Sequence, residues 1–188
     1  MTDAHNLNPR FVLTGGPGVG KTTVIEVLRS WGSHCFDDSA RAIIRERRAV
    51  GLPPRPAPAA FALEILRREI AAWDAAPMSE GPVFHDRGVV DALAMAEGNS
   101  ALAATEIADM LVRYPYRSPV FLFPPWREIF VQDRERDQDF EHVEAVHVGV
   151  RRYYGHVGHR IVEVPRGPVE ARAGFVVQHA LDALDTGD

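Results

Sequence analysis

Residues 11–28 read FVLTGGPGVGKTTVIEVL, and this stretch decides the fold. The apolar run 11–13 leads into a glycine-rich turn, after which apolar residues recur at helical spacing over 24–28. The sequence therefore predicts a strand, a glycine loop and a helix in direct succession. Between the strand and the helix, residues 15–22 fit the pattern G-x-x-x-x-G-K-[ST], and this is the context that the motif requires.

This pattern is the Walker A motif, or P-loop, of proteins that bind nucleoside triphosphates. Its glycines let backbone N–H groups approach phosphate oxygens, and the following helix adds the partial positive charge of its N-terminus. We expect Lys21 to bridge the β- and γ-phosphates and the Thr22 hydroxyl to ligate Mg²⁺. The alternative is a glycine-rich turn without a ligand. The residues expected to hold the nucleotide are Gly15, Gly16, Pro17, Gly18, Val19, Gly20, Lys21, Thr22 and Thr23.

Lys21 is also the single lysine among 21 basic residues. A chain that otherwise uses arginine is expected to keep lysine where a compact ammonium on a flexible stem is needed and a planar fork does not fit. This gives the motif modest, independent support.

Length and composition bound the class of protein. The chain has 188 residues, of which 46% are hydrophobic and 25% charged, so it is expected to be one globular domain over 1–188, with 1–9 flexible. No apolar run is long enough to cross a bilayer, and the polar start is not a secretory signal. The single cysteine, Cys35, favours a cytoplasmic setting. The formal charge of −5 argues against nucleic acid as a partner, and we expect no membrane partner either.

The rest of the chain alternates short apolar runs with helical patterns, which is typical of an α/β fold with a parallel sheet. In such a sheet the ligand site lies outside the carboxyl ends of the strands. Residues 51–58 hold four prolines and are expected to form a loop. Strands are predicted at 11–13, 33–36, 82–85, 119–123 and 160–164. Helices are predicted over the apolar spacing at 24–28 and at 39–50, 61–73, 89–96, 101–113, 127–154 and 168–184.

Two of the expected strand ends carry acidic residues. Asp86 is a candidate Mg²⁺ ligand, and Asp38 a candidate base or anchor for an acceptor hydroxyl, with Asp37 ranked below it. The simpler reading of Asp38 and Asp86 is that they cap the following helices. Arg87 could clamp the substrate or the transferring phosphate, or form a salt bridge with a nearby acid. His85 and Cys35 are expected to be packed in the core.

An arginine-rich segment, 126–136, interleaves acids and bases. It could be a solvated helix face with i,i+4 pairs. The functional alternative is a lid borne by 126–155, whose Arg134 and Arg136 close over the phosphates, neutralise charge and exclude water. Arg127, Arg151 and Arg152 are weaker candidates.

Together, the phosphate loop, the block DSARAII at 38–44, the DRG at 86–88, the block VFLFPPWREIF at 120–130 with its DRER, and HRIVEVP at 159–165 resemble a small P-loop AAA-domain family. That family includes the nicotinamide riboside kinase domain of a bacterial NAD regulator and a eukaryotic GTP-binding trafficking protein. The chain is also similar, more distantly, to deoxynucleoside and thymidylate kinases. The resemblance spans residues 10–178.

The resemblance implies a P-loop NTPase fold that is nucleoside-kinase-like, with a five-stranded parallel sheet sandwiched by helices and an arginine-bearing helical lid. By position, Asp38 matches the acid that anchors or deprotonates the accepting hydroxyl in those kinases. Asp86 and Arg87 match the acid–arginine pair for Mg²⁺ and substrate, and Arg134 and Arg136 match the lid arginines. The second strand ends in Asp instead of the usual Glu, and we see no nucleotidyltransferase or DNA-binding region.

We therefore predict an ATP-dependent phosphotransferase that moves the γ-phosphate to a hydroxyl of a small molecule, with a nucleoside-like acceptor favoured. The expected catalytic residues are Lys21, Asp38, Asp86, Arg87, Arg134 and Arg136, and the expected cofactors are ATP or GTP and Mg²⁺. The main alternative is a regulatory NTPase switch that acts through a protein partner. A GTP-dependent trafficking role finds little support, since the chain has no polybasic cluster or lipidation signal. The acceptor, the nucleotide preference and the oligomeric state stay open.

Overall fold

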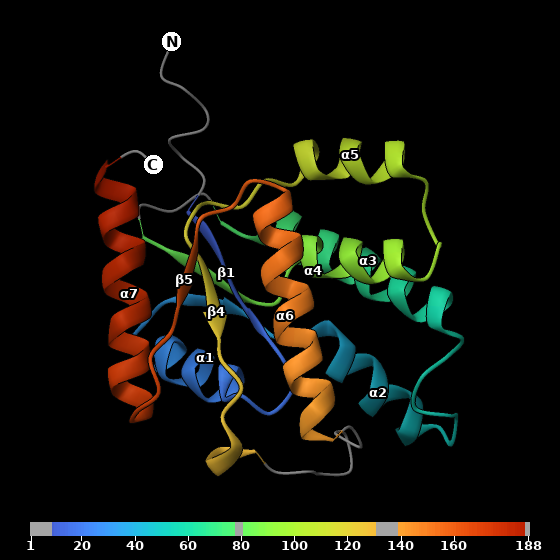
Figure 1. Cartoon of the computed structure of the whole chain (residues 1–188), viewed down its shortest axis with the longest axis horizontal. Helices are drawn as coiled ribbons and strands as arrows, with labels where there is room; N and C mark the ends of the chain where they lie inside the picture. Colours follow the sequence, from blue (N-terminus) through green and yellow to red (C-terminus); the bar gives the residue numbers. More distant parts are fainter. Residues whose placement is uncertain (1–8, 78–80, 131–138, 187–188) are drawn as a thin grey trace. The chain divides into compact units, whose positions relative to one another are not determined.

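The computed structural model describes residues 9–77, 81–130 and 139–186 (Figure 1). The protein chain divides into two compact units. The first, which we call the sheet unit, comprises Met1–Asp37, Ala76–Asp86 and Tyr116–Asp188. The second, which we call the helical unit, comprises Asp38–Ala75 and Arg87–Pro115. Each unit is described by itself.

A five-stranded parallel sheet forms the centre of the sheet unit. In order across the sheet, its strands are β2 (His34–Phe36), β3 (Val83–Asp86), β1 (Arg10–Gly15), β4 (Val120–Phe123) and β5 (Ile161–Glu163). Strand β1 lies at the middle of the sheet, paired with β3 and β4, and its carboxyl end leads into the glycine loop. The register pairs Leu13 of β1 with Asp86 of β3, so the loop and that acid leave the sheet at the same edge.

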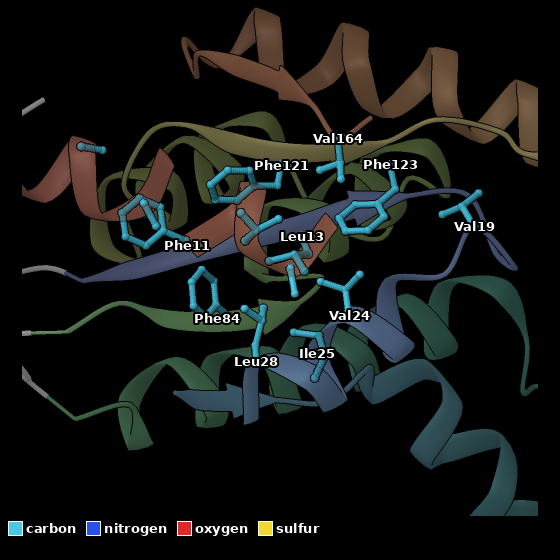
Figure 2. Packing of buried hydrophobic residues seen from close by; sticks show 14 of the residues in the cluster. Phe11, Leu13, Val19, Val24, Ile25, Leu28, Phe84, Phe121, Phe123 and Val164 are labelled. Carbon is cyan, nitrogen blue, oxygen red and sulfur yellow. The ribbon is translucent and has the colours of Figure 1, made fainter. Parts of the chain in front are cut away.

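The central strands are rich in apolar residues because a parallel sheet is covered on both faces. All residues of β1, β3 and β4 are buried. Figure 2 shows the packing of the side chains on one face, where Phe11 and Leu13 of β1 meet residues of α1 (Lys21–Ser30). The ring centroids of Phe84 and Phe121 each lie 6.1 Å from that of Phe11. Burial of this cluster is the main stabilising contribution to the unit.

Three α-helices complete the described part of the sheet unit. Helix α7 (Val169–Thr186) packs against α1, and α6 (Phe140–His156) contacts β1, β4 and β5 (Figure 1). A short 3-10 helix, Arg127–Ile129, follows β4.

The helical unit contains the four helices α2 (Ser39–Ala49), α3 (Pro58–Ala75), α4 (Val89–Gly98) and α5 (Ala104–Arg113). Consecutive helices of this series contact one another, and α3 packs most extensively against α4. The buried face of α3 carries Phe61, Ile65 and Leu66, as its apolar spacing predicts, but it also carries Glu69. The proline-rich residues 51–57 form the loop between α2 and α3.

The predicted α/β class, the five parallel strands and most of the helices are confirmed. The single helix predicted over 127–154 is wrong in extent, because Phe130 is extended and α6 begins only at Phe140, where Asp139 caps it. Residues 1–8 and 131–138 lie outside the described residues, so the expected flexible start and the lid arginines Arg134 and Arg136 stay predictions. Within the described part of the chain, no helix is both long and apolar enough to span a membrane.

Candidate phosphate-binding and acceptor sites

Close approach and backbone conformation explain two glycines of the loop. Gly20 has φ +82°, in the left-handed region that L side chains rarely adopt, and it is the residue from which α1 starts. A Cβ atom on Gly16 would lie 2.6 Å from Val143 Cγ1 of α6, so any side chain there would clash. The loop leaves the end of β1 and its backbone at Gly16 lies close against Val143 of α6.

The Lys21 side chain lies back over this loop. Its Nζ donates to the Gly16 carbonyl at 2.8 Å and to the Gly15 carbonyl at 3.3 Å, and the residue is only 6% exposed. The loop amides, the N-terminus of α1 and this ammonium place several positive partial charges around one short turn, as in an anion-binding site.

Thr22 and Asp86 are joined directly by a hydrogen bond. The Thr22 hydroxyl donates to Asp86 Oδ2 at 2.9 Å, although 64 residues separate them in the chain. Asp86 is buried at the end of β3. The structure thus brings together the two oxygen ligands that the sequence predicts for Mg²⁺.

This pair fits the metal that the P-loop implies. Mg²⁺ prefers hard oxygen ligands, and it is usually held by one or two protein oxygens together with phosphates and water. A hydroxyl and a carboxylate in contact, beside an anion-binding loop, match that ligand set. Among the described residues there is no cluster of three or more His, Cys, Asp or Glu side chains that would suit a metal held by protein alone.

An arginine of α7, not predicted from the sequence, also touches the loop. Arg172 is 4% exposed, and its Nη2 donates to the Val19 carbonyl at 2.7 Å. A signal exists in the sequence, because Arg172 occupies a position in the buried stripe of α7 with Ala173, Val176 and Ala180. A charged residue in such a stripe indicates a specific partner.

In the helical unit, Asp38 is both a helix cap and part of a charged cluster, which consists of Asp38, Arg87 and Asp91. Its Oδ1 accepts hydrogen bonds from the amides of Ala40 at 2.9 Å and Arg41 at 3.4 Å, as expected for an N-cap. Its Oδ2 lies 3.6 Å from Arg87 Nε. Asp37, which belongs to the sheet unit, instead forms an exposed 2.7 Å ion pair with Arg29.

Arg87 links two acids of the helical unit. Besides Asp38, its Nη1 lies 3.4 Å from Asp91 Oδ1, while Asp91 Oδ2 accepts from the Gly88 amide at 3.2 Å. Arg87 has φ +72°, an uncommon backbone conformation for a residue other than glycine. Such strain persists where the surroundings fix the residue, and here two carboxylates do so.

A third acid of this unit, Glu69, is another residue that the sequence analysis missed. It is 2% exposed on α3, and the hydroxyl and amide of Ser39 donate hydrogen bonds to it. Burial raises the pKa of Glu69 to about 8, helped by the negative charges of Asp38 and Asp91. The carboxyl is therefore mostly neutral at pH 7. Its sequence signal is a glutamate at a core-facing position of an amphipathic helix.

The remaining candidates have simpler environments. His85 is fully buried, with its ring stacked on Phe36 at 4.7 Å, and burial lowers its pKa to about 3. Burial likewise raises the pKa of the half-buried Cys35 to about 11, so its thiol stays protonated at neutral pH. Arg127 lies over the Phe140 ring, and Arg151 forms an exposed ion pair with Glu163.

A family described as an AAA domain matches residues 10–172. The chain belongs to this AAA-domain family. The match begins at β1 and ends within α7, so it includes the phosphate loop, both strand-end acids and Arg172. None of the curated proteins matches the chain.

Solved structures similar to this AAA domain include the NadR protein and several kinases. The NadR protein in complex with NR gives a TM-score of 0.66 at 16% identity over 96% of this chain, which spans about half (53%) of the NadR chain. Deoxyadenosine kinase from M. mycoides gives 0.64 at 12% identity, covering 92% of this chain and 99% of that one. Shikimate kinase from Aquifex aeolicus gives 0.55 at 15% identity, covering 95% and 99%. At these identities the likeness shows a shared fold.

Proposed function

We propose that this protein is an ATP-dependent phosphotransferase that moves the γ-phosphate of ATP to a hydroxyl group of a small, nucleoside-like molecule. The observation that carries the proposal is the 2.9 Å hydrogen bond between Thr22 and Asp86 beside Lys21 and the phosphate loop. This combination of a donor-rich turn and paired oxygen ligands suits a bound triphosphate with its magnesium ion. The similarity of fold to small-molecule kinases supports the same class of reaction.

In the proposed reaction, the bond between the γ-phosphorus and the β,γ-bridging oxygen breaks, and a bond from the γ-phosphorus to the acceptor oxygen forms. The loop amides and the Lys21 ammonium hold the phosphates and stabilise the negative charge that develops on them. Magnesium, when bound, neutralises phosphate charge, and Thr22 and Asp86 are the residues that would hold it.

The acceptor end of the reaction is assigned to the charged cluster of the helical unit. Asp38 accepts the hydrogen bond of the acceptor hydroxyl and takes its proton as the new bond forms. Arg87 is held between Asp38 and Asp91, and it provides a planar donor for a substrate oxygen. A nucleoside-like acceptor is favoured because Asp38 occupies the position of the hydroxyl-binding acid in the family resemblance. Arg134 and Arg136 are proposed to stabilise the transferring phosphoryl group.

A phosphotransfer screen tests this proposal. Purified protein with Mg²⁺ and ATP is mixed with pools of nucleosides, nicotinamide riboside, sugars and amino alcohols, and the products are read by mass spectrometry. A product heavier by one phosphoryl group, absent with Lys21→Ala, is the expected result. Full activity in Lys21→Ala would overturn the assignment of this loop as the active site. Slow release of phosphate without any phosphorylated product would favour the regulatory NTPase instead.

A further inference from the structure

Arg172 has a position that the phosphate-loop motif does not explain. Its guanidinium lies near two aromatic rings, with Cζ 4.8 Å from the centre of Phe123 and 5.4 Å from that of Trp126. Its Nη2 donates to the Val19 carbonyl at 2.7 Å, and its Nη1 lies where a Cβ on Gly20 would come within 2.6 Å. The guanidinium therefore covers the outer side of the Val19–Gly20 peptide.

The Arg172 guanidinium has no ion-pair partner among residues 9–77, 81–130 and 139–186. Burial alone lowers its pKa. The guanidinium still stays protonated at neutral pH, because arginine does not lose its proton in proteins. A buried charge is costly unless it is paired, and this one lies against the phosphate loop, where a bound phosphate would supply negative charge.

The hydrogen bond to Val19 also fixes the direction of a loop amide. In a trans peptide the carbonyl and the following N–H point in opposite directions. Holding the Val19 carbonyl toward Arg172 therefore turns the Gly20 N–H away from α7. A loop amide that is already oriented binds phosphate without an ordering cost.

We infer that Arg172 is a positioning residue for the triphosphate of the bound nucleotide, which it serves by fixing the Val19–Gly20 peptide and by adding positive charge beside the loop. The inference rests on the proposed nucleotide site. It concerns the phosphates and not the base, so inorganic tripolyphosphate should depend on Arg172 as much as ATP does.

Arg117 provides a matched control in the same unit. It is 6% exposed, and its Nη2 donates to the Ala183 carbonyl of α7 at 2.9 Å. Arg117 thus shares with Arg172 the burial, the side-chain type and a bond to a backbone carbonyl, but it bonds near the far end of α7 and not to the loop. A purely structural effect of losing a buried guanidinium should be similar at both positions.

The test measures the dissociation constants of ATP and of tripolyphosphate, each with Mg²⁺, by titration calorimetry, together with thermal unfolding. We expect Arg172→Met to weaken both ligands at least tenfold and by the same factor. Arg117→Met should lower the melting temperature but change both constants less than twofold. Arg172→Lys keeps the charge without the planar fork, so it should weaken both ligands by an intermediate factor. Arg172→Lys also serves as the test variant if Arg172→Met does not fold.

Three outcomes would overturn the inference: unchanged affinities in both Arg172 variants, loss of ATP affinity with normal tripolyphosphate affinity, or equal losses in the Arg172 and Arg117 variants. The proposed function fails differently. If the wild type binds both ligands with the expected dependence on Arg172 but phosphorylates no acceptor, the kinase proposal is wrong and the role of Arg172 stands.

Discussion

The carboxylate of Asp38 lies 3.6 Å from the guanidinium of Arg87 while its other oxygen caps helix α2. The capping bonds fix the direction of the side chain, so one oxygen faces the backbone amides and the other faces the arginine. Capping and a role at the site are therefore compatible in Asp38. The adjacent Asp37, which the sequence analysis ranks below Asp38, pairs with Arg29 on the surface instead.

The different environments of Asp38 and Asp37 predict different outcomes when each is replaced by asparagine. Asparagine caps helices as well as aspartate does, so Asp38→Asn should change the free energy of unfolding by less than about 1 kcal/mol. It removes the proton acceptor, however, and kcat/KM for phosphotransfer should fall by about 10²–10⁴. Steady-state kinetics with the acceptor found in the screen, alongside chemical denaturation, measures both.

Asp37→Asn is the control for this prediction. It removes only an exposed ion pair, of the kind worth about 0–1 kcal/mol, and should leave kcat/KM within twofold of the wild type. Equal losses of activity in the two variants would show that Asp38 has no special part in the reaction.

The contact between Thr22 and Asp86 leads to a prediction about magnesium. Thr22→Val replaces the hydroxyl by a methyl group of similar size, so the half-saturating Mg²⁺ concentration should rise at least tenfold, the equivalent of about 1.4 kcal/mol. A magnesium titration of the reaction rate at saturating ATP measures this. Thr22→Ser keeps the hydroxyl and should restore the dependence of the wild type. An unchanged magnesium dependence in Thr22→Val would remove Thr22 from the metal site.

Local patterns predict the phosphate loop and the strand ends well. The glycines of the loop need their backbone freedom whatever the rest of the chain does, and the apolar runs of β1 and β4 are buried on both faces. The order of residues therefore carries enough information to place Lys21, Thr22 and Asp86 at one edge of the sheet. The parallel register that pairs Leu13 with Asp86 brings the end of β3 beside the loop, where Asp86 accepts the hydrogen bond of Thr22.

The sequence was less informative where burial depends on distant partners. Arg172 bonds to a carbonyl 153 residues away, and Glu69 is held by Ser39 of another helix. Both occupy positions within the apolar stripe of a helix, and the periodicity of the stripe does not reveal which partner a charged residue has there. The helix predicted over 127–154 was too long because charged residues dominate its pattern. Its buried positions, Val143 and Tyr154, lie three turns apart on one face of α6.

The raised pKa of Glu69 predicts how stability depends on pH. The folded state keeps the proton up to a pKa of about 8, whereas the unfolded chain releases it near 4.5. Between these values the folded state binds more protons than the unfolded state, so the contribution of Glu69 to stability falls as pH rises, by up to about 1.4 kcal/mol per pH unit. Asp38 and Asp91 strengthen this trend because they repel the charged form.

Glu69→Gln keeps the size of the side chain and cannot ionise. Thermal unfolding of the variant should match the wild type near pH 4 and exceed it increasingly from pH 5 to pH 8. Each 1 kcal/mol corresponds to roughly 2–4 °C in melting temperature for a chain of this size. Above the folded pKa the difference should level off, because both states of the wild type are then ionised.

Glu64, on the same helix, supplies a control of opposite sign. Hydrogen bonds from Arg67 and Arg68 lower its pKa to about 2, so its contribution is present above pH 4.5 and is lost only as pH falls toward 2. The difference between Glu64→Gln and the wild type should therefore be constant from pH 5 to pH 9. A constant difference for Glu69→Gln over the same range would mean that Glu69 ionises normally in the folded protein, and the neutral carboxyl assigned to the helical unit would be wrong.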